Sequence, residues 1–174
     1  MPILSDGSIR AAIEAGDIRL DPAPEDLQYQ PASLDICLGA DYSNEHTGDI
    51  LTDCSELVIQ PHTFYLGTTE ETVSLPADVS AMVSGRSSLG RKGLIIHATA
   101  GWIDAGFEGE ITLEIYNFMN TPIVLTPGQR VGQLIFFQMD APAEEPYGTK
   151  ATSKYQNQRG PTPSRLENDP DYRH

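Results

Sequence analysis

The feature that most constrains this chain is a short alternation of apolar and polar residues that recurs along its length. Each stretch is bounded by Gly, Pro, Asn or Asp, and the sequence holds 15 Gly and 13 Pro. Alternation of this kind is typical of half-buried strands, and many short strands at close spacing favour a sandwich or a jelly roll. The clearest examples are Leu34/Ile36/Leu38, Phe64/Leu66, Val73/Leu75 and Ile111/Leu113/Ile115.

The two ends of the chain differ from this pattern. A short helix is predicted to begin at Ser5 or Asp6, with Ile9 and Ile13 on one face and an end at Gly16. Two later strands are predicted at 122–126 and 130–137. From residue 146 the chain becomes polar and poor in aliphatics, which divides it into a β domain, 1–145, and a C-terminal segment, 146–174. This segment is either a frayed terminus or an arm ordered by a ligand or a neighbouring subunit.

Charge is distributed unevenly along the 174 residues, whose net charge is −14. Before Arg86 there are two basic and 15 acidic residues, and from Arg86 onward nine basic and ten acidic residues. A chain with so few cations cannot build the broad basic face that nucleic-acid binding requires. A nucleoside triphosphate needs only a small local cluster, which the second half supplies. An acidic surface kept for solubility is the alternative, but it does not explain the asymmetry.

The chain has no apolar run long enough for a membrane span and does not begin like a signal peptide. It has two cysteines, too few for a disulfide scaffold. A cytoplasmic protein of one domain, with no membrane partner, is therefore expected.

Residues 85–93 contain three cations, two hydroxyls and three glycines. Glycines let backbone amides approach an anion, and arginines grip phosphate in a fork. The spacing matches neither the Walker nor the dinucleotide pattern. The segment is thus either a phosphate site or an ordinary charged turn.

Two carboxylates follow at Asp104 and Glu114. Asp104 lies in a turn-rich segment, 99–109, that is expected to form a hairpin, where an aspartate most often caps its own backbone. Glu114 lies in the middle of a strand. Because Ile111 and its alternate neighbours face one side, Thr112 and Glu114 face the other. Glu114 is therefore the harder of the two to explain as a solvated surface charge.

These segments together resemble the dCTP deaminase branch of the dUTPase superfamily. The resemblance lies in Gly-Arg-Ser-Ser-Leu-Gly-Arg at 85–91, Thr-Ala at 99–100, Ile-Asp-Ala-Gly-Phe at 103–107 and Thr-Leu-Glu-Ile-Tyr-Asn at 112–117. It extends to Gln-Pro-Ala-Ser-Leu-Asp at 30–35, to 127–133 and to 153–165. The family implies an all-β distorted jelly roll with a C-terminal arm that closes over the nucleotide. It also implies a homotrimer whose nucleotide sites lie between subunits.

The resemblance assigns a role to each matching residue. Glu114 is the general acid and base that activates water to attack carbon 4 of cytosine and then protonates the departing ammonia. Ser87 and Arg91 position this water and the base, reaching in from a neighbouring subunit. The backbone around Ala100 reads the base edge, and Asp104 contacts the deoxyribose. In relatives that cleave phosphate, that aspartate also activates water for attack at the α phosphorus.

The resemblance further implies that magnesium bridges the phosphate oxygens and is held mainly by the nucleotide itself. It implies dTTP as a feedback inhibitor. Thr112, which is predicted on the same face as Glu114, is also expected to bind substrate. The residues that match the triphosphate contacts are Arg86, Ser88, Gln133, Tyr147, Lys154 and Gln158.

The cysteines and histidines do not form the zinc pattern that many nucleotide deaminases use. Cys37 and Cys54 are 17 positions apart, and neither neighbours a histidine in such a pattern. The histidines are scattered and are expected to be structural or surface residues: His46, His62, His97 and His174. Deamination by this chain therefore requires water activation by a partly desolvated carboxylate beside a cation and a hydroxyl. Glu114, Arg91 and Ser87 supply these groups.

Three reactions remain open within the superfamily: dCTP to dUTP, dUTP to dUMP, or both in one enzyme. Deaminase-only members tend to have a bulky basic pair between Thr-Ala and Ile-Asp, whereas here Gly101 and Trp102 stand there. This pair, and the ending Gly-Pro-Thr-Pro-Ser-Arg at 160–165, resemble the bifunctional, dUMP-forming members. A regulatory module that binds nucleotide without turnover is the remaining alternative, but it would not need Glu114, Ser87, Arg91 and Asp104 all intact.

Overall fold

The computed structural model describes residues 2–173, and its first element is the predicted N-terminal helix. Helix α1 (Asp6–Glu14) is capped by the Ser5 hydroxyl, which accepts a hydrogen bond of 3.3 Å from the Ser8 amide. Ile9 is buried, and the helix is followed by Gly16 in a left-handed conformation with φ of 79°. The predicted helix and both of its boundaries are confirmed.

Strands make up most of the remaining regular structure. The longer strands are β3 (Ser33–Asn44), β6 (Phe64–Ser74), β7 (Val79–Gly85), β10 (Glu108–Asn117) and β12 (Arg130–Gln138). The shorter strands are β1 (Arg19–Asp21), β2 (Tyr29–Gln30), β4 (Asp49–Leu51), β5 (Leu57–Ile59), β8 (Leu94–Ile95), β9 (Trp102–Ile103) and β11 (Ile123–Leu125). The short helical turns are η1 (Asp26–Gln28), α2 (Ser87–Gly90) and η2 (Leu166–Asn168).

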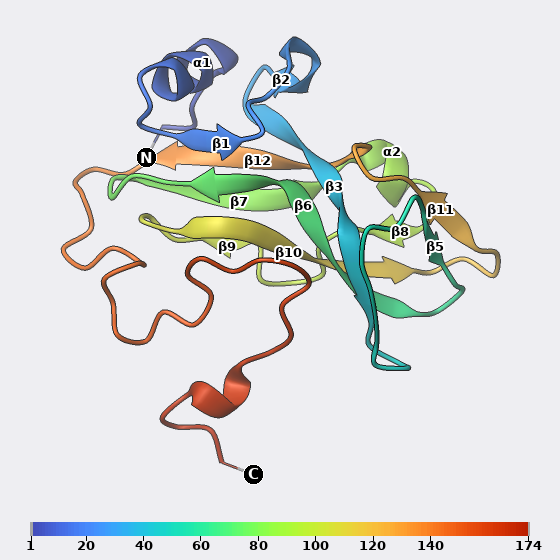
Figure 1. Ribbon diagram of the computed structural model, residues 1–174. Helices are drawn as coiled ribbons and strands as arrows, with labels where there is room; N and C mark the ends of the chain where they lie inside the picture. The colour runs from blue at the N-terminus through green and yellow to red at the C-terminus, as the bar shows by residue number, and fades with distance from the viewer. Residues whose placement is uncertain (1, 174) are drawn as a thin grey trace.

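The strands form one large antiparallel sheet that curls around the core (Figure 1). Its order is β8-β10-β6-β3-β12-β7-β9, with β1 added to β6, and β2 and β4 added to β3. Strands β11 and β5 pair separately. The predicted all-β, jelly-roll-like class is therefore confirmed.

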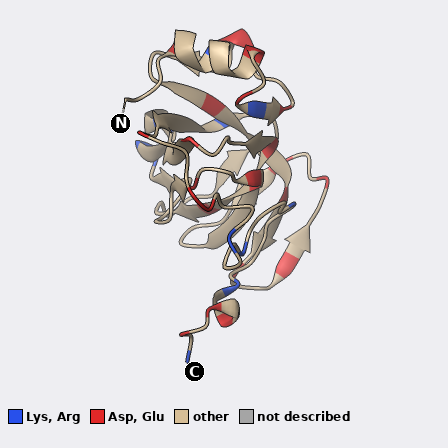
Figure 2. Ribbon diagram, turned by 90° about the vertical axis from the view of Figure 1, so that its left-hand side faces the viewer, with Lys and Arg blue, Asp and Glu red and all other residues tan. Residues whose placement is uncertain are grey.

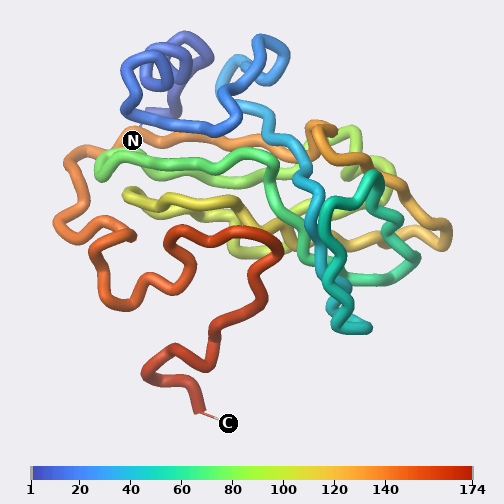
Figure 3. Tube along the Cα trace, in the orientation of Figure 1, coloured from blue at the N-terminus to red at the C-terminus, as the bar shows by residue number. Residues whose placement is uncertain are grey.

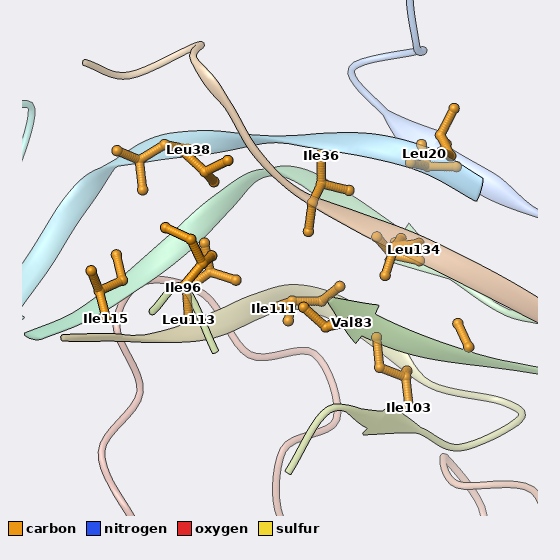
Figure 4. Close-up of a cluster of buried hydrophobic side chains, with 14 of the residues drawn as sticks. Leu20, Ile36, Leu38, Val83, Ile96, Ile103, Ile111, Leu113, Ile115 and Leu134 are labelled. Atoms are coloured by element: carbon orange, nitrogen blue, oxygen red, sulfur yellow. The ribbon is translucent and has the colours of Figure 1, made fainter. Parts of the chain in front are cut away.

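The core lies inside the curl of this sheet. Figure 4 shows Ile36 and Leu134 on one side and Val83, Ile103 and Ile111 on the other, gathered in one interior. All five side chains are at most 8% exposed. Their burial removes apolar surface from water, and this is the main favourable contribution to folding.

The predicted face alternation holds in β10 and fails in β3. In β10 every second residue from Gly109 to Asn117 is buried, and Glu114 lies on the other, half-exposed face. In β3 all seven residues from Ser33 to Gly39 are buried, so both faces of this half of the strand are covered. The polar residues there are accommodated by partners: Asp35 pairs with two arginines, and the Cys37 amide donates to Glu71.

The expected hairpin at 99–109 is wrong in its pairing. Strand β9 pairs with β7, whereas β10 pairs with β6 and β8. The turn at Asp104 therefore connects distant parts of the curled sheet rather than two neighbouring strands. The local turn residues indicated a reversal, but the partner of each flank depends on long-range packing.

The C-terminal segment runs along β9 and β10 before its last residues turn away from the sheet (Figure 3). A parallel bridge joins Gln158 to Gly109, and the Asn157 amide donates to the Glu108 carbonyl at 2.7 Å. Figure 2 shows acidic residues distributed from the N-terminal helix to the C-terminal segment. No helix in residues 2–173 is long and apolar enough to cross a membrane.

Candidate functional site

A cavity of about 490 Å³ lies between β10, the β9 turn and the C-terminal segment. Its walls are largely apolar and include Leu66, Val83 and Phe107, as is usual for a site that binds a small molecule. It unites residues from distant parts of the sequence. Six of the predicted site residues line it: Ala100, Asp104, Thr112, Glu114, Tyr147 and Gln158.

The Glu114 carboxylate is held in this cavity by main-chain amides. Its Oε2 accepts hydrogen bonds of 3.1 Å from the amides of both Ala98 and Thr99. Because both bonds go to one oxygen, Oε1 is left with no hydrogen-bond donor among residues 2–173. The carboxylate is therefore fixed in orientation and has one oxygen free to accept a proton from water.

Asp104 projects from the turn between β9 and β10. The turn is closed by the backbone, since the Phe107 amide donates to the Asp104 carbonyl at 3.2 Å. Gly106 adopts a φ of 88° there, and a Cβ at this position would lie 2.6 Å from Pro146. Within the described part of the chain the Asp104 carboxylate accepts no hydrogen bond, so it does not cap its own turn. It is exposed and lines the cavity.

The C-terminal segment forms one wall of the cavity. The Tyr147 ring packs against Phe107 with centroids 5.9 Å apart, and its hydroxyl accepts from the Tyr155 amide at 3.0 Å. The Gln158 side chain donates to the Glu110 carbonyl at 2.7 Å. These contacts position Tyr147 and Gln158 at the cavity, and Thr112 receives the Thr162 amide at 3.3 Å.

Lys154 is the third residue of this segment predicted to contact the triphosphate, and it forms an ion pair with Asp169 instead of lining the cavity. Its ammonium lies 2.8 Å and 2.9 Å from the two carboxylate oxygens of Asp169. That ion pair raises the pKa of Lys154 above its ordinary value. Lys154 does not line the cavity.

The remaining predicted residues also lie outside the cavity of their own chain. Ser87, Ser88 and Arg91 are exposed on and just after α2. Arg86 instead faces Asp35, with Nε 3.6 Å from Oδ2, and Gln133 accepts a bond of 3.1 Å from Ser33. One chain therefore separates its predicted residues into two groups, one around Glu114 and one around Asp35 and α2.

The sequence reasoning missed two residues at these groups. His97 lines the cavity, and both of its buried ring nitrogens lack a hydrogen-bond partner among residues 2–173. It was expected to be structural or on the surface, and a lone histidine carries no pattern that marks a cavity. Arg130 joins Arg86 on Asp35, with Nη1 3.1 Å from Oδ2. His174 lies outside the described residues.

Potential metal ligands do not cluster in the part of the chain that the structure describes. Across residues 2–173 no three His, Cys, Asp or Glu side chains gather as a metal site would require. Burial raises the pKa of the Cys37 thiol to about 12, so this cysteine remains protonated at neutral pH.

Solved structures with this arrangement define the class of protein. The crystal structure of 2′-deoxycytidine 5′-triphosphate deaminase from Agrobacterium tumefaciens matches 77% of this chain with a TM-score of 0.67 and 28% identity. The present chain spans 47% of that longer one. The EIAV dUTPase matches 75% of this chain and 93% of its own with a TM-score of 0.53 and 24% identity, which shows the fold alone. The curled sheet is thus the fold shared by dUTPases and dCTP deaminases.

The sequence comparisons narrow this class to one family. Residues 3–139 match the family model described as dCTP deaminase-like, so the chain belongs to this family. It is 43% identical to the dCTP deaminase of Halorubrum lacusprofundi over 98% of this chain and 94% of that one. It is 46% identical to the "dCTP deaminase, dUMP-forming" of Beutenbergia cavernae over 94% of each. The corresponding protein of Halobacterium salinarum, also named dUMP-forming, is 42% identical over 98% of this chain and 97% of its own.

Proposed function

We propose that this chain is a cytoplasmic, homotrimeric enzyme that converts dCTP to dUMP with release of ammonia and diphosphate. The observation that carries the proposal is the Glu114 carboxylate, fixed by two amides in a cavity with apolar walls. Relatives named dUMP-forming dCTP deaminases, at 42% and 46% identity over nearly the whole chain, support both halves of the reaction.

Deamination uses Glu114 as a proton carrier. A water molecule attacks carbon 4 of the cytosine ring, and its proton passes to Oε1, the oxygen that the amides leave free. Glu114 passes this proton to ring nitrogen N3, takes the second proton from the new hydroxyl on carbon 4 and delivers it to the exocyclic amino group. The bond between carbon 4 and that nitrogen then breaks, and ammonia leaves a uracil ring. Proton transfer by a positioned side chain typically contributes about 10²- to 10⁴-fold in rate.

Ser87 and Arg91 complete this site from a neighbouring subunit in the proposed trimer. Both are exposed and lie outside the cavity of their own chain, so they are available to another one. A hydroxyl and a guanidinium beside Glu114 would orient the attacking water and stabilise charge on the ring. A site shared in this way is formed only when the subunits assemble.

Asp104 is proposed to act in the second reaction, hydrolysis at the α phosphorus. Its carboxylate orients a water that attacks phosphorus, and the bond to the leaving diphosphate breaks. Trp102 lines the cavity beside it and packs on Phe137 with ring centroids 5.3 Å apart. A Cβ at Gly101 would lie 2.8 Å from the Val83 carbonyl, so a bulkier residue there would displace this turn. The Gly101-Trp102 pair therefore sets the local shape next to Asp104.

Magnesium is proposed to arrive with the triphosphate. The donor set fits an ion that keeps phosphate and water oxygens as ligands, since such an ion requires few protein carboxylates. When bound, it would neutralise phosphate charge. The cations that would share this task are Arg86 and Lys154, with Ser88, Gln133, Tyr147 and Gln158 donating hydrogen bonds. dTTP is proposed as a feedback inhibitor, since it differs from dUTP by one methyl group.

The C-terminal segment, 146–174, is proposed as an arm that closes on the nucleotide, and 1–145 as the domain that carries it. The support is the packing of Tyr147 on Phe107 and the bonds between Gln158 and Glu110. Tyr147 and Gln158, which line the cavity of their own chain, support this role for the segment.

Product analysis tests the proposal. The protein is incubated with magnesium and either dCTP or dUTP, and nucleotides, ammonia and diphosphate are quantified over time. We expect ammonia and diphosphate to appear together from dCTP, without accumulation of dUTP. Stoichiometric dUTP would show a deaminase alone, turnover of dUTP but not dCTP a dUTPase alone, and binding without products a regulatory protein.

A further inference from the structure

Asp35 is a buried carboxylate shared by two arginines. Its side chain is 3% exposed, and its Oδ2 lies 3.1 Å from Nη1 of Arg130 and 3.6 Å from Nε of Arg86. The Arg86 Nη1 also donates to the Arg130 carbonyl at 3.2 Å. Asp35 lies in β3 and Arg130 in β12, and Arg86 directly follows β7, which pairs with β12 on its other side.

Both guanidinium groups retain unused donors. About a third of each arginine side chain is exposed, 32% for Arg86 and 31% for Arg130. Among residues 2–173 no protein acceptor bonds to Nη2 of Arg86 or to Nε and Nη2 of Arg130. Two guanidinium groups therefore share one carboxylate here, in a chain whose net charge is −14.

The position of this trio links it to the residues already assigned to the triphosphate. Gln133 lies directly opposite Asp35 in the pairing of β12 with β3. Side chains of opposite residues share one face of a sheet and lie close together. Gln133, Arg86 and Arg130 are therefore grouped at the start of β12, beside α2.

We propose that Arg130 is a further triphosphate-binding residue and that Asp35 is the residue that positions it together with Arg86. This inference rests on the proposed function, since the anion is the phosphate chain of its substrate. Without a shared carboxylate, two adjacent guanidinium groups would repel each other. Asp35 holds them side by side before the nucleotide arrives, and the free donors then grip phosphate oxygens in a fork.

A structural role is the alternative explanation. Arg130 Nη1 also donates to the Leu27 carbonyl at 2.6 Å, so Arg130 connects η1 to β3. If this were its whole role, its loss would lower stability but leave nucleotide affinity unchanged in the folded fraction. The test must therefore separate affinity from stability.

The experiment compares Arg130→Gln, Arg130→Lys and Asp35→Asn with wild type. The readouts are KM and kcat for dCTP, the Kd of inorganic triphosphate by calorimetry, and the thermal midpoint. Arg19→Gln is the matched control, because Arg19 is 63% exposed and bonds to Ser74 and Glu108 rather than to Asp35. Arg130→Lys keeps a charge for Asp35, so it tests the proposal even if Arg130→Gln does not fold.

We expect Arg130→Gln to raise KM for dCTP and the Kd of triphosphate by about tenfold or more, with kcat little changed. Arg130→Lys should recover only part of this loss, because an ammonium cannot form the fork. Asp35→Asn should also raise the Kd of triphosphate. In the double variant Asp35→Asn/Arg130→Gln, the fold-increase in Kd should be smaller than the product of the two single fold-increases.

Values of KM and Kd within twofold of wild type in Arg130→Gln or Arg130→Lys would overturn the proposal, whatever the thermal midpoint. So would equal losses in the Arg19→Gln control. Failure of the proposed function is a separate result: the wild type would then release no ammonia from dCTP. The triphosphate Kd would still report on Arg130 in that case.

Discussion

The two walls of the proposed site differ in how far a single chain completes them. Around Glu114 the backbone of 98–99, strand β10 and the C-terminal segment together fix the carboxylate and enclose a cavity. By contrast, the side chains on and just after α2 are exposed and do not line that cavity: Ser87, Ser88 and Arg91. Preorganised groups need a rigid frame, whereas groups that serve another chain must be presented at the surface. In the proposed trimer, one chain would therefore position the base, and a neighbouring chain would supply the groups that assist it.

The largest expected effect concerns Glu114, on the side of the site that one chain completes by itself. Changing Glu114 to Gln removes the proton carrier but keeps an oxygen for the amides of Ala98 and Thr99. Ammonia release from dCTP should fall by about 10³-fold or more, while the Kd of dCTP changes little. Single-turnover kinetics and equilibrium binding measure the two quantities. Loss of binding together with activity would instead give Glu114 a structural role.

The contribution of the C-terminal segment to this side of the site is tested by removing the residues after Pro146. Tyr147 and Gln158 would be lost, and with them the contacts to Phe107 and Glu110. Turnover of dCTP should fall by about 100-fold, because the phosphate chain is no longer held in place. The thermal midpoint and the assembly state should remain close to wild type, as scattering and calorimetry can check. Retained turnover would show that the segment is only a frayed terminus.

The group of residues on and just after α2 is tested by mixing two inactive variants. The proposed trimer places Arg91 of one chain beside Glu114 of the next. The Glu114→Gln and Arg91→Gln variants are therefore mixed, unfolded and refolded together. Some sites then combine an intact Glu114 from one variant with an intact Arg91 from the other. Random assembly in equal amounts should restore about a quarter of wild-type ammonia release.

The control for that mixture pairs Glu114→Gln with the chain that ends at Pro146. Glu114 and the C-terminal segment of one site come from the same chain, and each chain in this mixture lacks one of them. No intact site should therefore form, and no activity should return. Recovery in this control, or none in the Arg91 mixture, would contradict the division between the two walls.

The smallest expected effect concerns Lys154, whose ammonium forms an ion pair with Asp169 within the C-terminal segment. If Lys154 must leave this carboxylate to reach phosphate, Asp169→Asn should lower KM for dCTP by less than about fivefold. The effect should shrink at high salt, because salt screens the competing ion pair. Asp171→Asn is the matched control and should leave KM unchanged. An increase in KM in Asp169→Asn would show that the pair instead holds the arm in its working position.

Local pattern was sufficient for much of the fold. The Ser5 cap, the buried alternation in β10 and the orientation of Glu114 all follow from periods of a few residues, which the backbone enforces wherever the strand pairs. The resemblance of ordered motifs to a family likewise depends on sequence alone. It led to the dCTP deaminase-like family that residues 3–139 match.

Long-range packing decided the rest. No local rule indicates that β9 pairs with β7, that His97 lines the cavity, or that Arg130 shares Asp35 with Arg86. The polar residues of β3 were predicted to face solvent, but Ser33 and Asp35 are buried and paired with residues from β12 and the start of α2. The sequence by itself therefore determined which residues lie in strands and which face they take, because those properties depend on neighbours along the chain. Only the tertiary structure decided which strands meet and which charges share a partner, because those contacts join residues far apart along the chain, such as Asp35 and Arg130.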